Sequence, residues 1–135
     1  MWNPLILGFI FILFSILGYF LEYINECRLG YCKEHTSYLT KPLPFLPIYG
    51  LGAVLLWNLT PYLVKYNIAV QFLLLLLLLT AFEYLSGKMR KVLTGEHSWQ
   101  YSNGNVVDIQ HSLIWALFGL VLIHIFAPIQ AYLKA

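Results

Sequence analysis

The segment "IAVQFLLLLLLLTAFEYL", residues 68–85, decides the fold class of this chain. It contains an unbroken run of leucines from Leu73 to Leu79 and a single charged residue, Glu83. A helix needs about 17–25 mostly apolar residues to cross a lipid bilayer, and this segment is long enough. We therefore expect it to form a membrane-spanning helix.

The composition of the whole chain is that of a membrane protein. Of its 135 residues, 60% are hydrophobic and only 10% are charged, whereas a soluble domain has about 25% charged residues. The net charge is +2 and the basic residues are scattered, which argues against a nucleic-acid partner. No Lys or Arg precedes the first apolar run, which also exceeds the roughly 7–15 apolar residues of a signal peptide. We expect that run to remain as a span.

Three further apolar segments predict helices on either side of the leucine run. The expected helices cover about residues 4–23, 48–64, 68–85 and 109–132, and polar loops cover about residues 24–47 and 86–108. The fold that we predict is all-α. It is a single transmembrane domain over residues 1–135, an integral membrane four-helix bundle of up-down topology, in contact with the lipid bilayer.

The basic residues predict how these helices are oriented. Those in or beside the two polar loops are Arg28, Lys33, Lys41, Lys88, Arg90 and Lys91, whereas the opposite side has only Lys65 and Lys134. Because loops rich in Lys and Arg stay in the cytoplasm, both loops should be cytoplasmic and both chain termini non-cytoplasmic. All the acidic residues map to the loop side, so we expect the opposite side to be nearly without polar chemistry.

Two acidic residues stand in matching positions at helix ends. Glu22 lies in "LEYI" and Glu83 in "FEYL", which suggests an internal duplication into two parallel helix-loop-helix repeats about an axis along the membrane normal. A carboxylate within the bilayer costs roughly 2.5–3.5 kcal/mol and is usually paired or functional. Glu22 and Glu83 therefore either meet in one polar site or pair separately with nearby basic residues at the membrane surface.

Other chemistry is less clearly indicated. The His and acidic residues of the polar loops have suitable ligand types for a metal, but their spacing is not diagnostic. His35 and His97 are weak metal candidates, and we predict no cofactor. Asp108 and His111 are three residues apart and would share a helix face. Neither a nucleophile elbow nor a Walker-type glycine loop occurs, so the chain itself should not hydrolyse ATP.

Several motifs occur together in a fixed order. They are Gly18-x-x-x-Glu22, "PFLPIYGLG" at 44–52, "FEYLSGKMRKVL" at 82–93, "HSWQYSNGN" at 97–105 and "SLIWALFG" at 112–119, followed by Pro128. In this combination the chain resembles, along nearly its whole length, the family named putative ABC-transporter permease, type IV. The resemblance implies a membrane-integrated chain in which seven residues occupy motif positions: Glu22, Tyr49, Gly50, Glu83, Trp99, Tyr101 and Asn105.

The chain departs from the family pattern at two places. Gln100 stands where the family reads an acid in Trp-Asp-Tyr-Ser. The interval from Asn105 to Trp115 is shorter than in the family and lacks a Gly-Arg pair at the start of the last helix. Asp108 and His111 occupy this interval instead, so a role of that arginine in anion binding would not carry over to this chain.

Three functions from different classes are compatible with these residues. The leading prediction is a small permease-like membrane protein with a cytoplasmic-facing polar site, formed by Glu22, Tyr49, Glu83, Trp99, Tyr101, Asn105, Asp108 and His111. Its expected partners are further copies or other membrane subunits, and a separate ATPase chain if it is an ABC component. The alternative is an intramembrane enzyme that acts on a lipid or amphiphile by carboxylate and histidine chemistry. A third possibility is a structural or regulatory membrane adaptor with no substrate, so whether the chain is an enzyme is left open.

Overall fold

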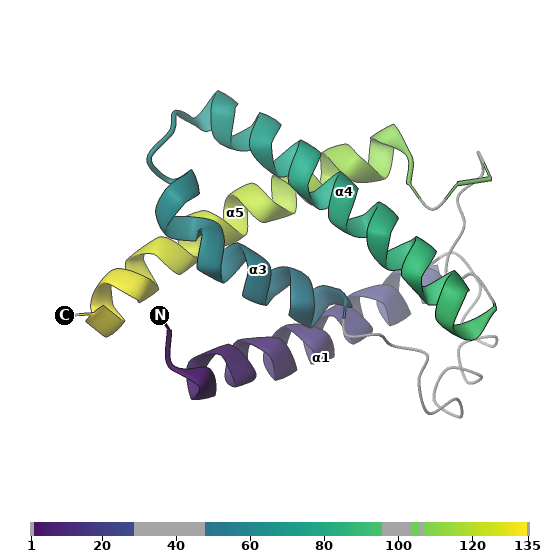
Figure 1. The fold of residues 1–135 in the computed structure, drawn as a ribbon, viewed down its shortest axis with the longest axis horizontal. Helices are drawn as coiled ribbons and strands as arrows, with labels where there is room; N and C mark the ends of the chain where they lie inside the picture. The colour runs from purple at the N-terminus through teal and green to yellow at the C-terminus, as the bar shows by residue number, and fades with distance from the viewer. Residues whose placement is uncertain (1, 29–47, 96–103, 106, 135) are drawn as a thin grey trace. The chain divides into compact units, whose positions relative to one another are not determined.

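The computed structural model describes residues 2–28, 48–95, 104–105 and 107–134. These residues form four helices: α1 (Pro4–Arg28), α3 (Ile48–Leu63), α4 (Ile68–Thr94) and α5 (Ile109–Lys134), shown in Figure 1. Within the described ranges no strand occurs. The prediction of an all-α fold is confirmed.

Three of the described helices, α1, α4 and α5, are long and apolar enough to cross a membrane. This length and composition make the chain an integral membrane protein. The span expected at residues 48–64 is not long enough to join them, because α3 has only 16 residues. At 1.5 Å per residue it is about 24 Å long, which is shorter than the roughly 30 Å hydrocarbon core.

Two helices extend beyond the ends expected from the apolar pattern. α1 continues past residue 23 to Arg28, and α4 continues past Leu85 to Thr94. The apolar pattern marks where the membrane ends, whereas the helix end depends on local backbone signals. In α4 that signal is Gly95, which adopts a left-handed φ of 76° and donates its N–H to the carbonyl of Lys91.

The chain divides into two compact units, residues 1–54 and 55–135. In the first unit, small residues bring α1 and the start of α3 into close contact. A Cβ atom on Gly18 would overlap the side chain of Tyr49, and one on Gly50 would overlap Ser15 and the carbonyl of Phe11. The two helix segments approach so closely that a methyl group does not fit at either position.

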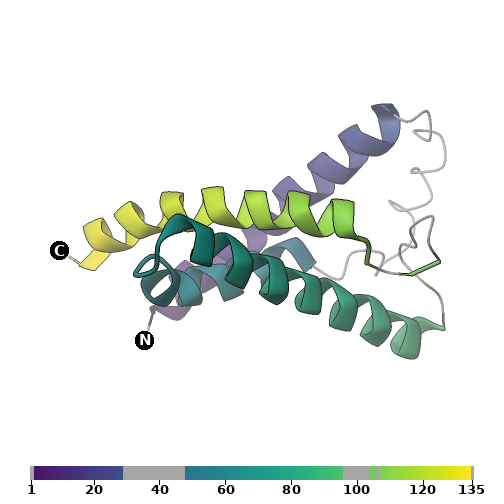
Figure 2. The same cartoon turned by 90° about the horizontal axis from the view of Figure 1, so that it is seen from above.

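In the second unit, α4 and α5 run antiparallel side by side, as both ribbon views show (Figures 1 and 2). The buried residues of α4 recur every four positions: Gln71, Leu75, Leu79, Glu83 and Gly87. Those of α5 alternate in steps of four and three: Ser112, Ala116, Gly119, Ile123, Phe126 and Gln130. We call these two sets the buried stripes. A Cβ on Gly119 would come within 2.7 Å of Leu79 Cδ1, so the stripes pack directly on each other.

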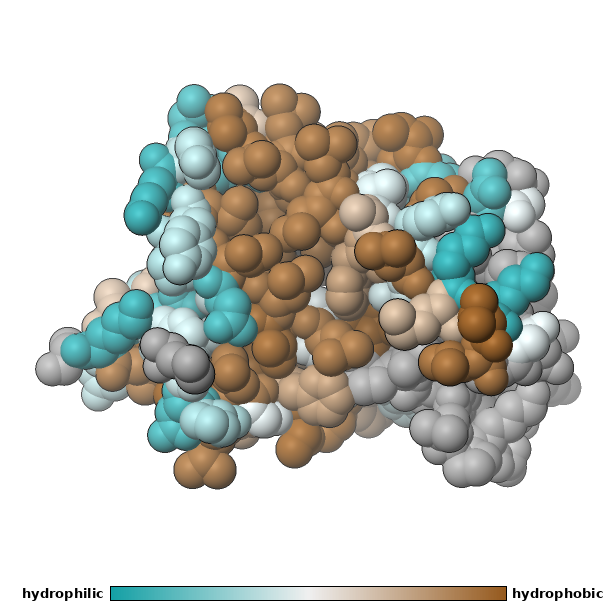
Figure 3. All heavy atoms as spheres, viewed as in Figure 1, coloured by the Kyte–Doolittle hydropathy of each residue, from teal (hydrophilic) through white to brown (hydrophobic). Residues whose placement is uncertain are grey.

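The outward faces of the helices are apolar, as expected for contact with lipid. Along α4 the surface is brown between teal side chains near the two ends of the helix (Figure 3). Leu77 is 71% exposed on α4 and Val121 is 58% exposed on α5. Apolar area of this extent is stable in a bilayer and would be an aggregation liability in water.

Candidate functional site

Glu83 is the acidic residue that α4 carries inside its apolar run, and it belongs to the buried stripe of that helix. Its exposed fraction is 8%. Two contacts set the register of the antiparallel pair, because Leu79 lies against Gly119 and Gln71 bonds His124. One turn beyond Leu79, about 6 Å along the axis, Glu83 is therefore level with the turn of α5 that contains Ser112 and Ala116.

Ser112 brings a hydroxyl group to this same end of the interface between α4 and α5. It is 3% exposed and belongs to the buried stripe of α5. Small residues follow it along the stripe, first Ala116 and then Gly119. The register thus places a carboxylate and a hydroxyl group close together at this end of the interface. They can accept and donate hydrogen bonds there.

Asp108 and His111 form a pair at the start of α5. The Nδ1 atom of His111 lies 2.8 Å from both carboxylate oxygens of Asp108, and the backbone N–H of His111 donates to Asp108 Oδ1 at 2.7 Å. Asp108 precedes Ile109, and its backbone carbonyl accepts from the N–H of Ser112. It therefore occupies the N-cap position of α5, where a short acidic side chain is strongly preferred.

The cap favours the charged form of Asp108 and selects the tautomer of His111. The backbone hydrogen bond from His111 is the main cause that lowers the pKa of Asp108, and the His111 side chain lowers it further against the opposing effect of burial. Asp108 is therefore a carboxylate at neutral pH. Because Nδ1 of His111 donates to it, a neutral His111 has its lone pair on Nε2. His111 remains 43% exposed in its side chain.

A second polar group lies at the other end of the unit, where the turn joins α3 to α4. The side chain of Gln71, which is 3% exposed, donates from Nε2 to the carbonyl of Tyr66 at 2.7 Å. Its Oε1 then faces Nε2 of His124 at 2.8 Å. Since an amide oxygen only accepts, His124 carries a proton on Nε2. Gln71 thus connects the turn to α5.

Gln130 makes the second connection at this end. Its Nε2 donates to the carbonyl of Trp57 at 2.6 Å, and the two residues are 4% and 2% exposed. Trp57 lies four residues before Pro61 of α3, and proline has no N–H to offer the carbonyl of residue i−4. Gln130 therefore supplies, from α5, the hydrogen bond that Pro61 removes from α3.

The expectation that this side of the molecule is nearly without polar chemistry is wrong for the described residues. Gln71 hydrogen-bonds His124 there, and Gln130 hydrogen-bonds the carbonyl of Trp57. Neutral amides do not stand out in a survey of charged residues. The sequence does contain a signal for both contacts. A glutamine inside an apolar helix needs a hydrogen-bond partner, and so does a carbonyl that a proline leaves without its partner in the helix.

The chain matches the family described as "Putative ABC-transporter type IV" over residues 9–135. It belongs to this family. The resemblance seen in the motifs is thereby confirmed, and the chain is a membrane protein related to putative ABC transporters. No curated protein and no solved structure matches it.

The residues at family motif positions have different structural roles. Tyr49 lies half-buried with its ring against Gly18, so these two motif residues pack on each other. Asn105 is exposed, and Glu22 lies in α1. Trp99, Tyr101, His35 and His97 lie outside the described residues.

The described residues contain no group of three or more His, Cys, Asp or Glu side chains that could hold a metal ion. The structure brings Asp108 and His111 together, and it buries Glu83 in the interface between α4 and α5. Glu22 and Glu83 belong to different units, and their convergence on one site stays a prediction.

Proposed function

We propose that this family member is a permease-like membrane subunit whose solute site is centred on Glu83. The observation that supports this is the burial of a carboxylate, 8% exposed, in the buried stripe of a membrane-spanning helix. An ionisable residue inside a membrane span is costly and usually marks a solute or ion pathway. Leucine at this position would pack against α5 without that cost.

The chemistry of the position indicates a class of solute. A buried carboxylate is stabilised by a positive charge or by several hydrogen-bond donors. Ser112, at the same level of α5, offers a hydroxyl group as a further polar contact. We therefore expect a cationic or donor-rich solute, such as an amine. In this proposal the motif residues Glu22, Tyr49, Trp99, Tyr101 and Asn105, together with Asp108 and His111, form the rest of the polar site.

The test is ligand-induced stabilisation of the full chain in detergent micelles. A panel of amines and amino sugars should contain at least one solute that stabilises the wild-type protein, by about 2.7 kcal/mol at one hundred times its Kd. Glu83→Gln should abolish the stabilisation, because the neutral amide cannot balance the positive charge. Gln71→Leu is the matched control, since it removes another polar residue of the same buried stripe and should leave binding intact.

Two outcomes would contradict the proposal. Equal stabilisation of the wild type and Glu83→Gln would show that the carboxylate does not contact the solute. Equal loss in Glu83→Gln and Gln71→Leu would show that both act only through the packing of α4 on α5. Circular dichroism of each variant checks that the helices are retained.

The proposed site faces the cytoplasm, with both chain termini on the other side. The support for this orientation is the excess of Lys and Arg in and beside the two polar loops. Lys65, at the turn between α3 and α4, and Lys91, near the end of α4, are both exposed. After replacement of Cys27 and Cys32 by serine, an impermeant maleimide should label Lys65→Cys in right-side-out vesicles and Lys91→Cys in inverted ones. The reverse labelling pattern would show that the loops are outside and the chain termini are cytoplasmic.

Transport would also require other chains. The sequence has no phosphate-binding loop of the Walker type, so ATP hydrolysis would come from a separate ATPase. The four described helices are too few to enclose a solute pathway by themselves. We therefore propose self-association or further membrane subunits. Light scattering of the purified protein tests self-association, and a monomer that transports solute by itself would refute this part of the proposal.

The alternative function is an enzyme that acts on a lipid or amphiphile. The observation that favours it is the pair formed by Asp108 and His111, in which the carboxylate orients the imidazole and leaves the lone pair on Nε2. The same contacts also cap α5, which is a sufficient structural role for Asp108. The two functions differ in turnover: an enzyme should convert a lipid or amphiphile and lose that turnover in His111→Gln, whereas a permease subunit should bind its solute without converting it.

A further inference from the structure

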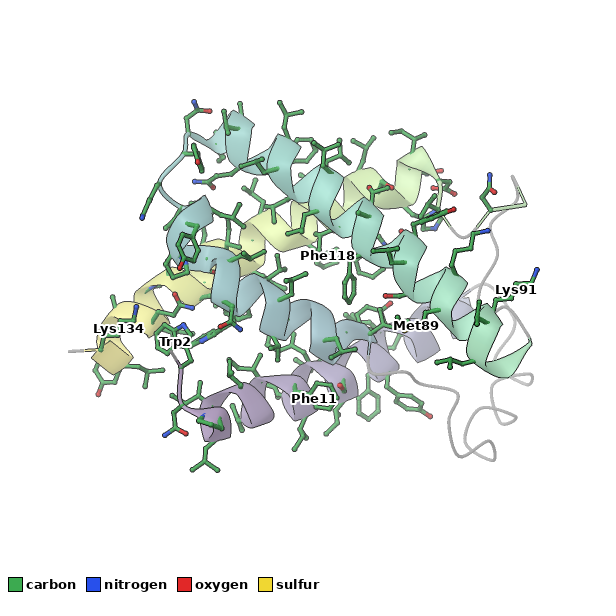
Figure 4. The ribbon with its side chains drawn as sticks, viewed as in Figure 1. Trp2, Phe11, Met89, Lys91, Phe118 and Lys134 are labelled. Atoms are coloured by element: carbon green, nitrogen blue, oxygen red, sulfur yellow. The ribbon has the colours of Figure 1, made fainter. Side chains whose placement is uncertain are left out.

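The end of α4 beyond Glu83 carries a row of aromatic and basic side chains on one face. Tyr84, Lys88 and Lys91 follow one another in steps of four and three, so they share this face of the helix. All three are exposed, and Lys88 Nζ lies 5.5 Å from the centroid of the Tyr84 ring. Figure 4 shows Lys91 pointing away from the last turns of α4. Arg90 adds a third positive charge to the same turns of the chain.

An apolar row runs beside this basic row. Leu85, Met89 and Val92 follow the same spacing on the neighbouring face, and they are 62%, 59% and 84% exposed. Brown and teal side chains lie side by side at this end of the helix in Figure 3. Toward the middle of α4 the row continues into exposed Leu77. The apolar row is thus continuous with the lipid-facing surface of the helix.

The lysines of this surface have no acidic partner within the described part of the chain. The ion pair found among the described residues joins His111 to Asp108. Lys91 in the last turn offsets the partial negative charge of the helix C-terminus, but Lys88 lies one turn earlier, with its Nζ over the ring of Tyr84. Two positive charges are therefore available to an anion at the membrane surface.

We infer that this end of α4 is a binding site for an anionic phospholipid. The lipid phosphate would contact the Lys88 and Lys91 ammonium groups, and an acyl chain would lie along Met89, Leu85 and Leu77. Clusters of basic residues next to a membrane span attract anionic headgroups, and each Lys or Arg raises the affinity roughly fivefold. A lipid fits better than a protein partner because the apolar row runs on into the bilayer-facing surface. The site is independent of the solute site proposed at Glu83.

The test is a native mass spectrometry titration of the full chain in detergent, with phosphatidylglycerol and phosphatidylcholine of identical acyl chains. The wild type should bind phosphatidylglycerol more tightly. The double variant Lys88→Gln/Lys91→Gln should weaken phosphatidylglycerol binding roughly 10- to 30-fold and leave phosphatidylcholine binding unchanged. Lys88→Arg/Lys91→Arg keeps the charge and should retain the preference.

The chain provides a matched control at the opposite end of α4. Lys65 Nζ lies 5.5 Å from the ring centroid of Tyr62, the same distance as that from Lys88 Nζ to the ring centroid of Tyr84. It has no second basic residue within one helical turn, so Lys65→Gln should not change phosphatidylglycerol binding. No preference in the wild type, an unchanged affinity in the double glutamine variant, or an equal loss in Lys65→Gln would overturn the inference. Unchanged lipid binding with loss of a copurifying protein would assign the surface to a protein partner instead.

Discussion

Replacing Gly50 by alanine is expected to destabilise the first unit by about 1–3 kcal/mol, the usual cost of overpacking. The added Cβ would overlap the carbonyl of Phe11 as well as the hydroxyl of Ser15. A side chain could rotate away, but the carbonyl is part of the backbone of α1. The start of α3 must therefore move away from α1, and the ring of Tyr49 would lose its packing against Gly18. Unfolding by SDS or urea in mixed micelles, followed by circular dichroism, measures the change.

Gly8 provides a control in the same unit. It lies in α1, and a Cβ atom there would meet nothing within 4 Å. Gly8→Ala should be neutral or stabilising by about 0.5–1 kcal/mol, because alanine has the higher helix propensity. If Gly8→Ala and Gly50→Ala have the same effect, the close contact between α1 and α3 is not what makes glycine necessary at position 50.

Gln130→Leu is expected to destabilise the second unit by about 1–2 kcal/mol, the upper range measured for hydrogen bonds between membrane helices. Leucine fills similar space, so the loss isolates the hydrogen bond to the Trp57 carbonyl. The carbonyl is buried, and Pro61 denies it the usual partner within the helix. Because the ring of Trp57 packs edge-on against Phe126, with centroids 5.1 Å apart, its fluorescence should also report the change locally.

A double-mutant cycle decides whether Pro61 is the reason that Gln130 matters. Pro61→Ala restores an N–H that can reach the Trp57 carbonyl within α3. Gln130→Leu should then cost at most about 0.5 kcal/mol in the Pro61→Ala background, the level at which independent sites add. Full additivity of the two substitutions would mean that Gln130 acts through packing alone.

Much of the fold was predictable because hydrophobicity acts directly on it. The leucine run of α4 is too long and too apolar for any other environment than lipid, and α5 follows the same rule. The helix ends were less predictable, since Gly95 terminates α4 through its backbone conformation well beyond the apolar run. α3 begins at Ile48, as the apolar pattern predicted, and ends at Leu63, one residue before the expected end.

The candidate site was predictable where a residue is costly by itself. Glu83 stands out in the sequence because a carboxylate in a membrane span is costly and is usually paired or functional. In the structure it is buried. No single segment indicates the roles of Gln71, His124 and Gln130. Their hydrogen bonds depend on how neighbouring helices are aligned, which one segment of sequence does not specify. Asp108 was predicted as a site residue, and its most direct role in the structure is to cap α5.

The hydrogen bonds of Gln71 and Gln130 have a mechanical consequence for the second unit. Both tie α5 to the end of the unit at which α3 turns into α4. This end can serve as a pivot, about which a small tilt of α4 against α5 produces little displacement nearby. Glu83 lies about 18 Å further along α4 at 1.5 Å per residue, so the same tilt is amplified there by leverage. A given tilt of α4 against α5 would therefore displace Glu83 further than it displaces the residues beside Gln71.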